Sequence, residues 1–182
     1  NIFEFLNKYD LDLQKNLVLD SKCGNVQVQQ SVGLFRMNRA VQYPFFPVVD
    51  TFNSKDSVAG IIVNKLEQIL PLFPSEIKID TVRSENVLYV STLFTSSNNS
   101  GLMSSNFMLS PDPQQNPFLK LLGQSGKVLS ALSSLKGGGE LMLISDSKFL
   151  SDEGGMSIPD NMVFLMNAVD YLADDEDLIS LR

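Results

Sequence analysis

The sequence predicts an α/β fold with three layers and a largely parallel central sheet. Two short apolar runs end in an aspartate, Leu17-Val18-Leu19-Asp20 and Leu141-Met142-Leu143-Ile144-Ser145-Asp146, and such runs are typical of buried strands. Segments with helical spacing alternate with these strands, and loops rich in glycine and serine bound them. Helices and strands that interleave in this way favour a parallel sheet covered on both faces.

The N-terminal third predicts a helix, a strand and an extended arm. Residues 2–9 place their apolar side chains on one helical face, and the strand at 17–20 follows. Val26 and Val28 alternate with glutamines, so residues 26–43 are predicted to form a β-hairpin or an extended arm. Two prolines hold the segment 43–47 extended. Asp56 is predicted to cap a short helix.

The rest of the chain predicts further strands and helices around one long loop. Residues 87–94 form a strand, and residues 96–117, rich in serine, asparagine and proline, form a mobile loop. Helices are predicted over 117–122 and 126–135, and Gly137-Gly138-Gly139 ends the second. In residues 161–172 one apolar stripe predicts a helix that faces the core. The stripe contains Met162, Leu165, Met166, Val169 and Leu172.

The amino-acid composition excludes several kinds of catalytic and metal site. The 182 residues contain no histidine and one cysteine, Cys23, and the formal net charge is -7. Without histidine there is no Ser-His or Cys-His pair and no His-containing zinc site. A negative net charge argues against nucleic-acid binding. We expect one α/β domain over 1–182, excised from a longer, membrane-anchored protein, with no cofactor and no metal.

The acidic residues concentrate near the C-terminal end. Residues 140–182 contain ten acidic and two basic side chains, a net charge of -8, whereas residues 1–139 contain 11 acidic and 12 basic ones, a net charge of +1. The densest run, 174–177, is interpreted as a solvated loop after a helix. It lacks the central glycine and the alternating oxygen ligands of a calcium loop.

Four polar residues lie where ligands bind in open α/β sheets, just beyond the ends of strands. They are Asp20, Ser96, Ser97 and Asp146. Asp20 and Asp146 form a carboxylate pair if their strands are neighbours, although aspartates at strand ends more often cap turns. These residues are the candidate site of a soluble receptor for a small sugar or peptide.

A second candidate surface combines basic and aromatic residues and is proposed to bind a partner. It contains Arg36, Arg39, Tyr43, Phe45 and Phe46, with a solvated hairpin as the alternative. Ser145 and Lys148 also match the S-x-x-K pattern of serine acyl transferases, but the companion motifs are missing, so a hydrolase is the weakest hypothesis.

Several segments, taken in order, resemble a known family. They are Leu17 to Asp20, Tyr43 to Pro47, Leu72 to Ile77, Leu93 to Ser97, Leu143 to Leu150, Asn161 to Leu172 and Leu178 to Arg182. Together they resemble the extracytoplasmic domain of auxiliary subunits of ABC-type transport systems, the group that includes the gliding-motility protein GldG of Bacteroidetes.

The resemblance implies a non-catalytic binding or scaffolding domain. It implies a position at the periplasmic face of the inner membrane, a membrane anchor outside this fragment, and an ABC permease and ATPase as partners. It also implies a fold like that of class I glutamine amidotransferases without their catalytic residues; a flavodoxin-like order is the alternative. The segment 106–139 departs from the family pattern, and the resemblance supplies no ligand residues.

Overall fold

Antiparallel pairing organises the sheets of this protein. The computed structural model describes residues 1–32, 35–112, 115–116, 120–152, 154–155, 158–175 and 179. One sheet has the order β6-β8-β9, with β6 at Val87–Thr95, β8 at Val128–Leu135 and β9 at Glu140–Ile144. The remaining strands form pairs: β1 (Leu11–Leu13) with β5 (Ile77–Ile79), β2 (Leu17–Asp20) with β7 (Ser100–Met103), and β3 (Cys23–Val32) with β4 (Phe35–Pro47).

The predicted parallel α/β fold is therefore wrong. Each pair of named strands among the described residues is antiparallel. The apolar runs at 17–20 and 141–144 do form strands, as predicted, but β2 pairs with β7 and β9 pairs with β8. The error has a physical reason, since an antiparallel strand packed on both faces shows the same continuous apolar run as a parallel one.

The strand β8 occupies a segment that was predicted to be a helix. Val128, Leu129, Leu132 and Leu135 have helical spacing, but the segment pairs with β6 on one edge and β9 on the other. Residues 129–134 are all buried. Both faces of this central strand are therefore covered, and the sequence lacks the alternation of apolar and polar residues that usually indicates a strand. Ser130 fits because its hydroxyl donates a hydrogen bond of 2.9 Å to the carbonyl oxygen of Leu143. The three glycines that follow form the turn into β9, with Gly138 and Gly139 at positive φ.

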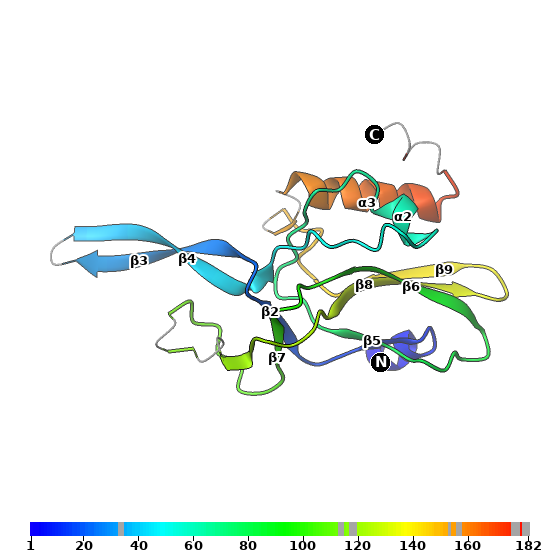
Figure 1. Ribbon diagram of the computed structural model, residues 1–182, viewed down its shortest axis with the longest axis horizontal. Coiled ribbons are helices and arrows are strands. Elements are labelled where there is room, and N and C mark those ends of the chain that lie inside the picture. The colour runs from blue at the N-terminus through cyan, green and yellow to red at the C-terminus, as the bar shows by residue number, and fades with distance from the viewer. Residues whose placement is uncertain are drawn as a thin grey trace.

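The three-stranded sheet is covered on both faces (Figure 1). The helices α2 (Ala59–Ile62) and α3 (Pro159–Leu172) pack on one face, in a cluster that includes Leu93, Leu132 and Phe164. The helix α1 (Ile2–Asn7) and the β1-β5 pair pack on the other face, around Leu11 and Ala131. As predicted, Asp56 holds the start of α2: its Oδ1 accepts hydrogen bonds from the N–H groups of Val58 and Ala59, although the N-cap position itself is Val58.

The helix α3 forms where the sequence predicts it, but the stripe predicted to face the core is only partly buried. Met166, Val169 and Leu172 are 42%, 55% and 45% exposed and face outward, whereas Met162 and Leu165 are half-buried. Phe164 and Ala168 are buried instead, together with two asparagines. Below, "the α3 stripe" means Met162, Leu165, Met166, Val169 and Leu172, of which the last three form the exposed part.

Polar side chains attach α3 to the rest of the molecule. The Asn161 side chain accepts a hydrogen bond from the N–H of Leu70 at 2.9 Å and donates one to its carbonyl oxygen at 3.1 Å. The Nδ2 of Asn167 donates to the Ile62 carbonyl oxygen at 3.1 Å. Because buried polar groups require partners, these contacts fix the helix face as firmly as apolar packing does. Hydrophobic periodicity alone does not reveal them.

Two predicted features fall partly outside the described residues. The helix predicted over 117–122 includes 117–119, and the closing motif 178–182 is described only at Ile179, which is buried. The segment 96–117, which the sequence assigns to a loop, contains β7 in its described part, and Ser100 of β7 is fully buried.

Candidate functional site

The carboxylate of Asp20 is a fully buried acceptor at the end of β2. Its oxygens accept hydrogen bonds of 2.6 Å from both the N–H and the hydroxyl of Ser97, and one of 2.9 Å from the N–H of Lys22. Charge-assisted bonds of this kind hold a loop tightly. The structure thus brings together Asp20 and Ser97, two of the four predicted ligand residues, and their mutual bonds join β2 to the start of the 96–99 loop.

The other two predicted ligand residues lie in separate contacts. The Ser96 hydroxyl, which is buried, accepts a hydrogen bond of 2.8 Å from the N–H of Lys127. The Asp146 carboxylate accepts bonds from the N–H of Leu72 at 2.7 Å and of Lys148 at 2.6 Å. Burial raises the pKa of Asp146, although these N–H groups act in the opposite direction. The four residues act as internal acceptors and donors at these positions.

The Ser145–Lys148 pair does not have the geometry of an activated serine. The Ser145 hydroxyl oxygen is buried and has no hydrogen-bond partner, whereas Lys148 is exposed. An activated nucleophile needs its base within hydrogen-bond reach. In the described part of the chain, no group of three or more histidine, cysteine, aspartate or glutamate side chains is placed to hold a metal ion.

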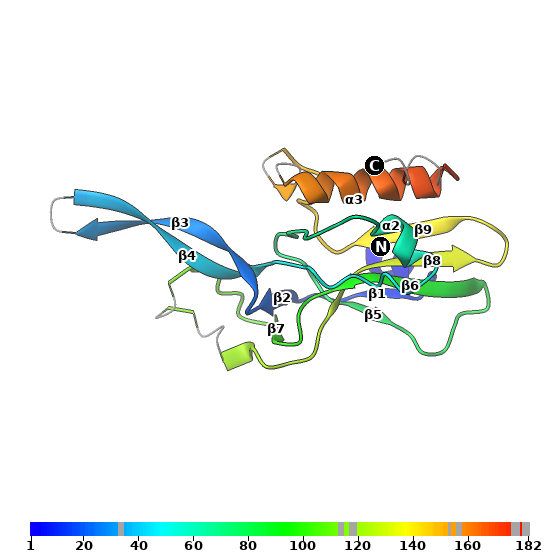
Figure 2. The same ribbon diagram turned by 45° about the horizontal axis from the view of Figure 1, so that its top comes forward.

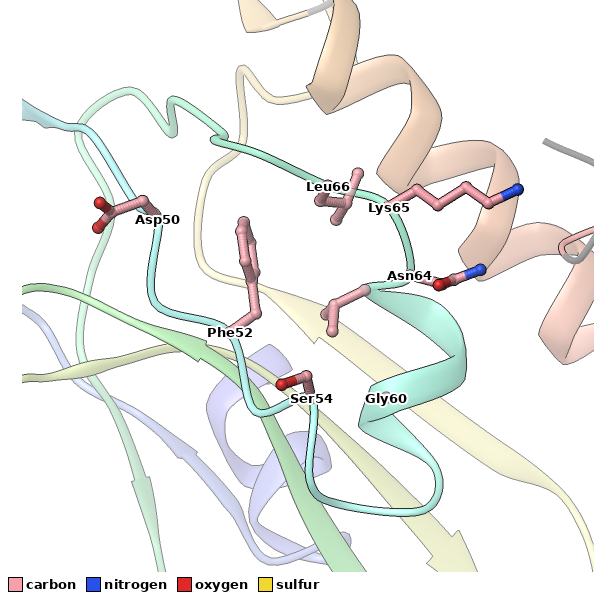
Figure 3. A pocket seen from close by; sticks show the side chains of 8 residues that line it. Asp50, Phe52, Ser54, Gly60, Asn64, Lys65 and Leu66 are labelled. Carbon is pink, nitrogen blue, oxygen red and sulfur yellow. The ribbon is translucent and has the colours of Figure 1, made fainter.

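A pocket of about 390 Å³ lies between the 50–54 segment and α2, and sequence reasoning missed it (Figure 3). Phe52 and Leu66 line its interior, while the side chains of Asn64 and Lys65 point away from Phe52 and the Asp50 carboxylate points to the opposite side. A hydrogen bond from the Lys22 ammonium lowers the pKa of Asp50. Specific small-molecule sites have polar groups that converge on the ligand, and here the charged groups at the rim diverge.

The strands β3 and β4 form an arm that projects from the body (Figure 1 and Figure 2). "The arm" here means residues 23–32 and 35–47. The register pairs Val26 with Val41, Val28 with Arg39 and Gln30 with Met37, and paired residues share a face. By alternation Phe35 lies on this same face. The opposite face is polar: it contains Asn25, Gln27, Gln29, Ser31, Arg36, Asn38, Ala40 and Gln42.

The apolar face of the arm is covered only near the body. Val26 packs against a cluster that includes Phe45 and Tyr43, both of which are buried. Towards the tip, Phe35 is 76% exposed and Met37 is 59% exposed. Of the five predicted partner residues, the structure therefore places Arg36 and Arg39 on the exposed arm, and the three aromatic ones at its base, where Phe46 is half-buried.

A crevice of about 480 Å³ separates the arm from the 104–112 segment. Val28, Arg39 and Val41 form one wall, and Pro111 and Asp112 contribute to the other. The Tyr43 hydroxyl donates a hydrogen bond of 2.6 Å to the Leu109 carbonyl oxygen and so ties this segment to the base of the arm. The exposed apolar residues Phe107, Met108 and Leu109 belong to the same segment.

Fold and surfaces together define a β-rich domain with exposed apolar side chains on the arm and on α3. A family model described as an ABC-type uncharacterized transport system matches residues 1–168, so the chain belongs to that family. Membership makes it an auxiliary component of an ABC-type transport system, which implies membrane transporter partners. No curated protein and no solved structure gives a significant match. Among the described residues, no helix is long and apolar enough to cross a membrane.

Proposed function

We propose that this chain is a non-catalytic binding and scaffolding domain that assembles subunits of its transport system. The observation that carries the proposal is the arm, a projecting hairpin whose apolar face ends in the exposed Phe35 and Met37. A lone two-stranded hairpin is only marginally stable in water. Exposed apolar patches of this kind commonly mark interaction sites.

The polar residues support the same proposal. Asp20 and Asp146, the strongest candidates for ligand or acid-base chemistry, direct both carboxylate oxygens to backbone or serine donors of this chain. These carboxylates hold loops of the chain, whereas apolar side chains of the arm and of α3 are exposed.

Co-expression with the ABC permease and ATPase of the same transport system tests the proposal. The tagged protein is expected to retain both subunits during purification, and Phe35→Ser together with Met37→Ser to release them. Val82→Ser is the matched control, because Val82 is 81% exposed and lies outside the arm. Retention that is equal for the arm variant and the control would contradict a role of the arm, and loss of all retention with the unaltered chain would contradict the proposal.

The location is part of the proposal: the domain lies at the periplasmic face of the inner membrane, as in the GldG-like group of gliding-motility proteins, with its membrane anchor elsewhere in the protein. The resemblance of the sequence segments to that group motivates this placement. A cysteine introduced by Val82→Cys, with Cys23→Ser as background, reports the compartment. A maleimide that does not cross the inner membrane is expected to label it in intact cells. Labelling that requires lysis would place the domain in the cytoplasm.

A further inference from the structure

The tip of the arm and the C-terminal part of the α3 stripe are two apolar surfaces that stay exposed in the single chain. On α3, Met166, Val169 and Leu172 are about half exposed, and on the arm Phe35 and Met37 are more so. The stripe runs from Met162 to Leu172, about 15 Å at the rise of an α-helix. The apolar face of β4 runs from Phe35 to Val41, about 20 Å at the rise of a strand. The face of the arm is therefore long enough to cover the whole α3 stripe.

Their charges are opposite. The arm contains two basic side chains, Arg36 and Arg39, and no aspartate or glutamate. Residues 149–181, which contain α3, include eight acidic side chains and no lysine or arginine. Arg39 lies on the apolar face of the arm, and Asp174 and Asp175 are exposed just beyond the C-terminal end of α3. Opposite charges around apolar faces favour one docking partner over others.

The same charges disfavour pairing of like surfaces. Two α3 helices in contact would bring acidic groups together, and two arms packed through their apolar faces would bring Arg39 close to its copy, whereas Arg36 lies on the opposite face. Juxtaposed like charges cost free energy and suppress the wrong partner. In both views the arm projects away from the α3 of its own chain (Figure 1 and Figure 2), so the contact requires a second molecule.

We infer that the arm of one copy packs its apolar face on the α3 stripe of a second copy. The crevice of about 480 Å³ beside Val28, Arg39 and Val41 leaves the arm face open towards its base. One contact of about 20 by 10 Å is smaller than a standard interface, so a twofold pair in which each copy gives its arm and offers its α3 is the expected form. The inference rests on the proposed function and names one partner of the binding domain.

Cross-linking tests the contact directly. In a Cys23→Ser background, Met37→Cys is made in one preparation and Val169→Cys in a second preparation of distinguishable mass, and the two are mixed under oxidising conditions. The expected product is a mixed disulfide that joins the cysteine of the Met37→Cys chain to the cysteine of the Val169→Cys chain. The matched control replaces Val169→Cys with Val82→Cys, in the connection between β5 and β6, and is expected to give no mixed product. Disulfides between two arms, or between two α3 helices, in place of the mixed one would overturn the inference.

Self-association gives a second measurement. Sedimentation equilibrium of the 182-residue chain is expected to show a mass that rises towards two chains with concentration. Met37→Ser and Val169→Ser are each expected to weaken self-association roughly tenfold or more, as truncation of a central interface residue does. Val82→Ser should change nothing. Both positions are exposed in the single chain, so loss of folding is not expected, and circular dichroism checks it.

The two proposals fail in distinguishable ways. A chain that stays monomeric at every concentration, but is still retained with the transporter subunits, overturns the inference and leaves the proposed function intact. A chain that dimerises through arm and α3, but retains no transporter subunit, overturns the proposed function.

Discussion

The orientation of α3 can be tested by truncating Phe164, the aromatic side chain that joins the helix to the sheet. Phe164 is fully buried, and its ring lies edge-on to Phe94 and Phe149, with centroids 5.4 and 5.8 Å apart. Phe164→Ala is expected to lower the free energy of unfolding by about 4 kcal/mol, because phenylalanine truncations in cores cost ~3–5 kcal/mol. The expected loss is a large part of the ~5–15 kcal/mol that stabilises most domains.

Urea unfolding followed by circular dichroism measures this loss. With a slope of about 2 kcal/mol per molar urea, the midpoint of Phe164→Ala should fall by about 2 M. Met166→Ala is the matched control on the same helix; Met166 is 42% exposed, and its truncation should change the free energy by less than about 0.5 kcal/mol. If Met166→Ala costs as much as Phe164→Ala, the stripe faces the core and the reasoning above is refuted.

Three further predictions concern the buried polar groups. Asp20→Ala should lower the free energy of unfolding by about 3 kcal/mol, because it removes the acceptor of the Ser97 bonds. A double-mutant cycle with Ser97→Ala, measured by urea unfolding, should give a coupling energy of about 1–3 kcal/mol. If the two substitutions are additive, the hydrogen bonds between these side chains are contradicted. Burial raises the pKa of Asp146, so its ionised form costs stability at neutral pH and the cost disappears as pH falls through the folded-state pKa. The unfolding free energy relative to Asp146→Asn should therefore rise from about pH 7 to about pH 4, and a fall would contradict this. Burial also raises the pKa of Cys23, so a disulfide reagent at neutral pH should react more slowly with the folded chain than with the urea-unfolded chain; equal rates would contradict this.

Local elements were predicted from the sequence better than their pairing. The strand at β2, the hairpin of β3 and β4, the Asp56 cap and the extent of α3 are all confirmed. Each depends on nearby residues: an apolar run, an alternation, a capping side chain. The parallel sheet was wrong because strand direction depends on partners far along the chain, such as β2 with β7, and an apolar run contains no information about direction.

The candidate site was predicted only in part for a related reason. The sequence places Asp20 and Ser97 at strand ends but does not show that one bonds the other across 77 positions. The pocket around Phe52 comes from segments that each read as ordinary loop, and no spacing rule links Phe52 to Lys65. Such sites become visible only when the chain is folded.

The stripe on α3 that was predicted to face the core shows what hydrophobic periodicity does and does not determine. Spacing places Met162, Met166 and Val169 on one face, but it does not say whether that face meets the core of the same chain or another molecule. Asn161 and Asn167 show which face of α3 meets the rest of the chain, because their side chains form hydrogen bonds with Leu70 and Ile62. The buried face of α3 combines Phe164 and Ala168 with these two asparagines, and a second apolar strip at Met166, Val169 and Leu172 stays exposed. The apolar stripe is therefore better explained by a contact outside the single chain than by the core, and the uneven distribution of the -7 net charge favours a basic surface as its counterpart.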